Sequence, residues 1–162
     1  MNGLPADAPL NSGEAFARVN AVTHPTIDDF RMMVYLEASA KNAYYEMAET
    51  APSQEIAELL QANGREELAH AHRVANVIEL ITGEPFVVPA PEDNQYAKRS
   101  GVKVERALLE NLVKAENNGN DLYETWASHI DHAEAAVLLR QNGVEEIRHG
   151  ERMSQALALL GD

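Results

Sequence analysis

Apolar side chains recur along most of this chain in steps of three and four residues, the spacing that keeps one face of an α-helix turned inward. Four long segments show the pattern. We predict helices over about residues 26–50, 53–82, 101–129 and 132–160. Thr26 with Asp29 can form a capping box at the start of the first helix, and Ser53 can cap the second.

Connections of very different length join these predicted helices. Residues 51–53 (APS) separate the first two and Asp131 separates the last two, so each pair is expected to form an antiparallel hairpin. Residues 83–100 carry three prolines and can span up to roughly 60 Å, enough to cross the whole bundle. The predicted fold class is all-α, a bundle of two antiparallel helical hairpins joined by a long crossover.

Two regions of the chain differ in composition. Residues 1–25 are rich in Pro, Gly, Asn and Ala and are expected to be a flexible arm, in which GEAFARVNAV can form a short helix. Residues 26–162 are expected to form the four-helix domain.

The chain also contains an internal duplication. LLQANGREELAHAHR begins at Leu59, and LLRQNGVEEIRHGER begins 79 residues later at Leu138. The same offset carries Glu37 onto Glu116 and Tyr44 onto Tyr123. Two unrelated amphipathic helices share apolar positions by chance, but they do not share polar positions on both helices of a hairpin. The sequence therefore reads as two hairpins of one design.

A glutamate interrupts the apolar face of each predicted helix near its middle, and in the second and fourth helices a histidine follows one turn later. These side chains are the expected metal ligands: Glu37, Glu67, His70, Glu116, Glu146 and His149. In each hairpin the two glutamates lie about 15 residues from the turn, so all four carboxylates should meet at one level. A single Glu-x-x-His is usually accidental, but two such pairs in register with two further glutamates are not.

Buried carboxylates repel one another and lose hydration, at several kcal/mol per ion. Two divalent cations would balance the four charges, and a Glu and a His three residues apart on a helix can bind the same ion. We expect Glu37 with His70 at one ion, Glu116 with His149 at the other, and two bridging carboxylates, those of Glu67 and Glu146. Carboxylate and imidazole ligands favour two iron ions, with manganese possible.

Other polar residues lie near these positions. Tyr44 and Tyr123 follow the terminal glutamates by two turns, and are either core aromatics or hydrogen-bond donors to the ligand carboxylates that assist catalysis from outside the ligand set. Asn63 and Asn142 precede the bridging glutamates by one turn and can bond carboxylates or backbone. The remaining histidines fall off the inward face and are expected at the surface: His24, His72, His129 and His132.

Composition narrows the functional classes. The net charge of −13 argues against nucleic acid and anionic membranes as partners. The chain has no cysteine, which excludes disulfides, thiolate metal sites and iron–sulfur clusters. No run of some 18 apolar residues predicts a membrane span, and the N-terminal sequence lacks the features of a secretory signal, so a cytoplasmic location is expected by default.

The paired motifs resemble those of a known family. EASAKNAYYEMA from Glu37 and ELAHAHR from Glu67 are similar to the first hairpin of rubrerythrins, and AENNG around Glu116 and EEIRHGER around Glu146 to the second. Rubrerythrins belong to the ferritin-like di-iron carboxylate superfamily, and the resemblance covers about residues 26–160. It implies a ferritin-like bundle without haem, two iron ions, peroxide or O₂ as oxidant, ferroxidase or peroxidase activity, and a homodimer or larger homo-oligomer.

The sequence departs from the rubrerythrin pattern in two ways. Rubrerythrins commonly carry another glutamate three residues after the third helix's ligand, where this chain has Gly119, and that glycine can leave an opening for a substrate. The cysteine-bearing electron-transfer domain is absent, so an external electron donor is expected. The alternatives are a di-iron or di-manganese oxygenase acting on an organic substrate, an iron-storage ferritin-like protein, and a non-enzymatic metal sensor or structural bundle. Storage is disfavoured because ferritin cages add a C-terminal helix, whereas 13 residues follow His149 here, and because Leu68 replaces a haem-binding methionine.

Overall fold

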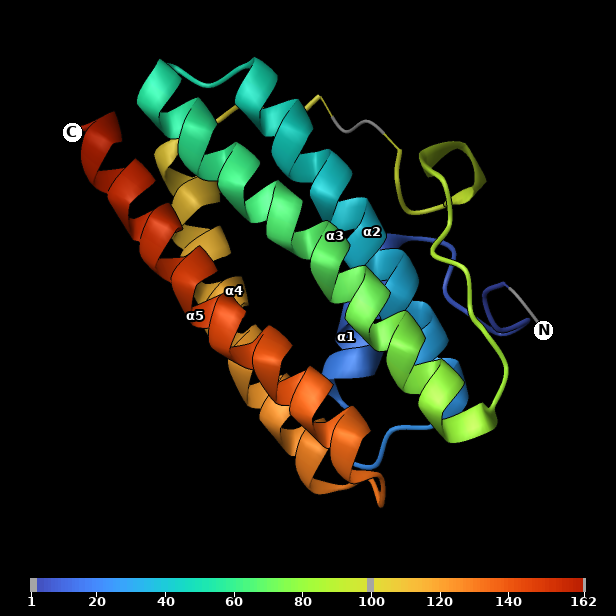
Figure 1. Cartoon of the computed structure of the whole chain (residues 1–162). Coiled ribbons are helices and arrows are strands. Elements are labelled where there is room, and N and C mark those ends of the chain that lie inside the picture. The colour runs from blue at the N-terminus through green and yellow to red at the C-terminus, as the bar shows by residue number, and fades with distance from the viewer. Residues whose placement is uncertain (1–2, 99–100, 162) are drawn as a thin grey trace.

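The computed structural model describes residues 3–98 and 101–161, and this part of the chain is helical with no strand (Figure 1). The described residues do not include 1–2 of the predicted arm, 99–100 of the predicted connection, or 162 at the end of the predicted domain. The elements are α1 (Ser12–Asn20), α2 (Ile27–Glu49), α3 (Gln54–Thr82), the 3₁₀ turn η1 (Pro91–Asp93), α4 (Arg106–Ser128) and α5 (Ala133–Leu160). The predicted all-α, ferritin-like helical bundle is confirmed. No helix in the described residues is long and apolar enough to cross a lipid bilayer.

The bundle consists of two hairpins, α2–α3 and α4–α5, whose turns lie at opposite ends (Figure 1). The hairpins meet through α3 and α5, which pack against each other. Among the described residues α2 and α4 are not packed as closely, and they meet through long side chains such as Phe30 and Trp126, whose ring centroids lie 5.3 Å apart. The connection lies against α2, where Asn94 Nδ2 donates to the backbone oxygen of Tyr35 at 2.8 Å. The helices are therefore in close contact on one side of the bundle and farther apart on the opposite side.

The helix ends follow the capping signals in the sequence. The hydroxyl of Thr26 accepts from the backbone N–H of Asp29, whose carboxylate accepts from the backbone N–H of Thr26, so the predicted capping box is confirmed. Ser53 caps α3 as predicted. The predicted start of the third helix at residue 101 is wrong, since α4 begins at Arg106. Gly101 has a φ of +64°, which is incompatible with a right-handed helix.

The N-terminal segment contains the short helix that its sequence permits. Ala15 and Val19 of α1 are fully buried, and α1 packs against α2. The indole Nε1 of Trp126 donates to the backbone oxygen of Val22 at 2.9 Å, which joins the segment after α1 to α4. The flexibility expected for residues 1–25 stays a prediction, but the described part of this segment contacts the bundle.

The apolar core is divided into two clusters. One contains Phe30, Val74 and Trp126, near the turn of the second hairpin, and the other contains Ile56 and Met153, near the turn of the first. Between the clusters lies a layer of buried polar side chains. Burial of apolar surface on both sides stabilises the bundle and leaves the polar layer fixed at mid-height.

Two glycines at duplicated positions bring the helices of each hairpin close together at this layer. Gly64 and Gly143 are buried. A Cβ on Gly64 would lie 3.1 Å from the Cβ of Tyr44, and a Cβ on Gly143 would lie 3.2 Å from the Cβ of Tyr123. Because a tyrosine Cβ moves only with its helix, a larger side chain at either glycine must push the two helices apart.

We predict that Gly143→Val lowers the free energy of unfolding of the metal-free protein by about 2 kcal/mol, the usual cost of overpacking a close contact. Urea unfolding followed by circular dichroism measures the change. Gly13→Val, at an exposed helical position where an added Cβ would make only an ordinary contact, is the control for the change in helix propensity. Equal losses in the two variants would show that the contact with Tyr123 has no energetic effect.

Candidate metal centre

Each helix of the bundle contributes one glutamate to the polar layer. The carboxylates of Glu37 (α2), Glu67 (α3), Glu116 (α4) and Glu146 (α5) are at most 8 % exposed. His70 and His149 follow the glutamates of α3 and α5 by one turn and are fully buried. The structure thus brings all six residues expected as ligands into one layer.

His70 faces three of the carboxylates through its Nδ1 atom. The nearest oxygens are Oε1 of Glu146 at 3.2 Å, Oε2 of Glu67 at 3.5 Å and Oε2 of Glu37 at 3.7 Å. These residues come from three different helices, so the group forms only when both hairpins are folded and docked.

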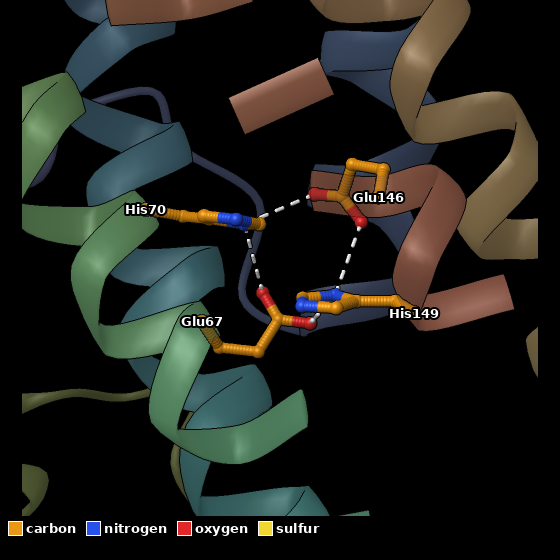
Figure 2. Close-up of side chains that lie close together, drawn as sticks. All are labelled: Glu67, His70, Glu146 and His149. Atoms are coloured by element: carbon orange, nitrogen blue, oxygen red, sulfur yellow. Dashed lines mark ion pairs between the residues drawn. The ribbon is translucent and has the colours of Figure 1, made fainter. Parts of the chain in front are cut away.

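His149 faces a second set of three. Its Nδ1 lies 3.4 Å from Oε1 of Glu67, 3.4 Å from Oε2 of Glu146 and 3.5 Å from Oε2 of Glu116. Glu67 and Glu146 therefore direct one oxygen to each histidine, and Figure 2 shows each of these carboxylates joined to both rings. This is the form expected for two shared and two terminal carboxylates, while the ligand roles themselves stay predictions.

The donor atoms fit cations in chemistry and spacing. The Nδ1 atoms of His70 and His149 are buried and make no hydrogen bond. Leaving a buried polar atom unsatisfied costs about 1–3 kcal/mol, so two at one site require an explanation. Glu67, His70, Glu146 and His149 each offer one ligand atom within 4.8 Å of the others. Atoms that bind one ion at roughly 2.1 Å lie about 3 Å apart at right angles, close to the spacing found here.

Without a metal ion, the site neutralises its charge with protons. Burial lowers the pKa of both imidazoles, but the surrounding carboxylates outweigh it and raise the pKa of His149 to about 12 and that of His70 well above its ordinary value. Burial raises the pKa of Glu116 to about 7, and burial with the negative charge of Glu37 and Glu146 raises the pKa of Glu67 well above its usual range. Cations and protons therefore compete for the same ligand atoms.

Two tyrosines cross-link the hairpins at this layer. The hydroxyl of Tyr44 on α2 donates to Glu116 on α4, and the hydroxyl of Tyr123 on α4 donates to Glu37 on α2. Of the two interpretations that the sequence left open, the structure shows the hydrogen bonds to carboxylates. Burial, and next the negative charge of the carboxylate that accepts the hydrogen bond, raise the pKa of both tyrosines well above 10. Both hydroxyls therefore keep their protons.

Sequence reasoning assigned no role to the residues that support the histidines. Nε2 of His70 lies 3.1 Å from Oε2 of Glu145, an ionised carboxylate that only accepts, so Nε2 carries the proton and Nδ1 is directed at the site. Arg73 donates to both oxygens of Glu145, at 2.8 and 3.1 Å. The hydrogen bond from His70 and the contacts of Arg73 lower the pKa of Glu145 to about 2.

The other half of the site repeats this arrangement. Nε2 of His149 lies 3.1 Å from Glu66, which accepts two hydrogen bonds of 2.9 Å from Arg152. Asn63 donates to the backbone oxygen of His149 and accepts from Arg152, so the backbone alternative for this asparagine is confirmed. Asn142 makes the equivalent bonds in the first half. The identity of these polar residues 79 positions apart was the signal that could have assigned their role.

The remaining histidines lie away from the polar layer. His24, His72 and His129 are exposed, as predicted. His132 is only partly exposed, because its Nδ1 accepts from the backbone N–H of Ala135 and caps α5. None of the four has an ionic contact with the six central residues among the described interactions.

A cavity of about 830 Å³ reaches the layer from the open side of the bundle. It lies between α2 and α4, and its lining includes all four central glutamates, both tyrosines and Gly119, but neither central histidine. A Cβ on Gly119 would lie 3.0 Å from Cγ of Glu146. Gly119 therefore lets the Glu146 side chain lie directly against α4 and leaves the carboxylates accessible from the cavity.

Comparison with known proteins identifies the family to which the chain belongs. Neither the curated proteins nor the solved structures include a significant match to the chain. The rubrerythrin family model matches residues 32–157, a range that contains the six central residues, both tyrosines and the residues supporting the histidines. By this match over most of its length, the chain belongs to the rubrerythrin family.

Proposed function

We propose that the polar layer binds two redox-active divalent metal ions, and that the loaded protein is an oxidoreductase that reduces peroxide or O₂. The observation that carries the proposal is the pair of buried Nδ1 atoms on His70 and His149. Each has no hydrogen-bond partner and faces three carboxylate oxygens. Membership of the rubrerythrin family supports the same function.

The ligand chemistry favours iron, with manganese as the alternative. Four carboxylates and two imidazoles form a hard-to-borderline set that suits either metal. Structural zinc sites are usually closed by four ligands, and calcium and magnesium prefer oxygen alone. When bound, two ferrous ions supply the two electrons that convert hydrogen peroxide and two protons into two water molecules.

The protein's own groups orient and protect this chemistry. Glu145 and Glu66 fix the tautomer and direction of the two histidines. Tyr44 and Tyr123 hold the outer carboxylates in place from the opposite hairpin. Because the chain has no cysteine to form a thiolate electron-transfer site, we propose that electrons reach it from another molecule.

We predict that the wild-type protein binds two ferrous or manganous ions per chain and that the double variant Glu67→Ala, Glu146→Ala binds neither tightly. The variant removes both shared carboxylates, which face both histidines, and circular dichroism checks that it is folded. Anaerobic titration with metal analysis gives the stoichiometry. Glu79→Ala with Glu134→Ala removes two exposed acids from the same helices and should bind as wild type does. Unchanged binding in the first variant would exclude this site.

We predict that Glu145→Gln weakens metal binding by 10- to 100-fold, the usual cost of losing a carboxylate behind a histidine ligand. Glu66→Gln should have a similar effect, because it occupies the equivalent place behind His149. Competition with a chelator of known affinity measures the change. Glu124→Gln is the matched control, since Glu124 also pairs with an arginine, Arg140, but is exposed. Wild-type affinity in both site variants would mean that these carboxylates do not support metal ligands.

We predict that anaerobically prepared ferrous protein is oxidised by hydrogen peroxide faster than ferrous ion in the same buffer. Stopped-flow absorption in the near ultraviolet follows the ferric product. The double variant lacking Glu67 and Glu146 should react no faster than the buffer. A wild-type protein that binds iron but shows no spectral change on mixing would rule out the oxidoreductase while leaving the metal site intact.

A further inference from the structure

The cavity between α2 and α4 is far larger than the proposed oxidants need. Its volume is about 830 Å³. A water molecule takes up about 30 Å³ of liquid, and hydrogen peroxide and O₂ are little larger. Cavities of roughly 300–1,000 Å³ are the size of sites for small organic molecules. The volume of the cavity therefore fits a small organic molecule better than either oxidant.

The walls of the cavity are mainly apolar near the carboxylates. Met33 on α2 and Leu112 and Leu122 on α4 contribute large side chains. Ala40 on α2 faces the cavity at the position that corresponds, by the 79-residue offset, to Gly119 on α4. Because these two positions carry small residues, the space continues inward to the carboxylates of both hairpins.

The N-terminal segment and the crossover form another part of the wall. Phe16 of α1 and Tyr96 of the crossover both line the cavity. The Tyr96 hydroxyl donates to the backbone oxygen of Pro9 at 2.8 Å, and Gln95 Nε2 donates to the same oxygen at 3.0 Å. Two segments outside the four-helix bundle are thus tied together beside the cavity, and each adds an aromatic ring to its wall.

The cavity offers almost no positive charge to an anionic ligand. Lys98 is the only basic residue in the described lining. Lys98 is exposed, so its charge is well solvated and provides no buried partner for an anion. The whole chain carries a net charge of −13. A neutral, largely apolar molecule meets neither the repulsion nor the desolvation cost of an anion.

We propose that this cavity is the binding site for a neutral, apolar organic molecule, one end of which lies against the glutamate layer beside Gly119. The proposal deepens the proposed function and rests on it for the chemistry that the bound molecule undergoes. Binding itself requires only the walls of the cavity, so it can be measured without metal.

The full chain, metal-free and iron-loaded, is titrated with Nile red as a neutral fluorescent probe, and the probe is then displaced with 1-decanol. We expect saturable binding of one probe per chain. Ala43→Trp fills the cavity from α2 at an exposed position away from the carboxylates, and should weaken binding at least 10-fold. Ala115→Trp does the same from α4, so the comparison survives if one variant fails to fold. Val137→Trp adds the same side chain at an exposed site on α5 outside the cavity, and should bind as wild type does.

Several results would overturn the proposal: no saturable binding to wild type, binding unaffected by both cavity-filling variants, or binding reduced equally by the Val137 control. The wild-type protein could instead be a dimer that does not bind the probe, while the tryptophan variants are monomers. That result would show that a second copy of the chain covers the cavity. Metal stoichiometry and oxidation by hydrogen peroxide, measured on the same samples, report on the proposed function separately. A failure of probe binding with intact peroxide chemistry refutes the cavity proposal alone, and the reverse result refutes the oxidoreductase alone.

Discussion

Four carboxylates in the interior of an apolar bundle repel one another, and the rest of the structure depends on how that repulsion is relieved. Water relieves only part of it, because each of these residues is at most 8 % exposed. Positive charge has to come from protons or from metal ions. The two buried imidazoles can carry protons at Nδ1 or present lone pairs there, so the same atoms accommodate either kind of countercharge. This makes metal binding and proton release two sides of one equilibrium.

The duplicated hairpin explains how a short chain builds such a site. Each hairpin contributes two glutamates, one histidine and one tyrosine, and the tyrosine of each hairpin bonds the outer glutamate of the other. Neither hairpin can complete a set of three carboxylates alone. Arg148 departs from the symmetry: it contacts both Glu66 and Glu145, while the equivalent position in the first hairpin is Ala69. A single arginine thus links the carboxylates behind both histidines.

The periodicity of apolar residues predicted the four long helices. Polar side chains that interrupt the apolar faces predicted the six central residues, because burial of such residues is physically unusual. Features that depend on three-dimensional packing could not be predicted in this way. The predicted start of α4 was wrong because Gly101 has a positive φ and Glu105 is extended, and neither conformation can be deduced from the sequence. No role was predicted for Glu66 and Glu145. Each follows the helical pattern of a solvent-exposed glutamate, and only the folded structure shows that it faces a histidine of the opposite hairpin.

The two sides of the polar layer differ in a way that gives the site a direction. Where α3 packs on α5, the histidines are backed by ionic and amide groups that bond one another. Where α2 faces α4, Ala40 and Gly119 leave the carboxylates open to a large apolar space. The layer is therefore open on the carboxylate side, while the network behind the histidines holds the two imidazoles in place. A bundle closed on both sides would hold metal ions as a structural element, whereas an opening toward the carboxylates is what a reaction with an incoming molecule requires.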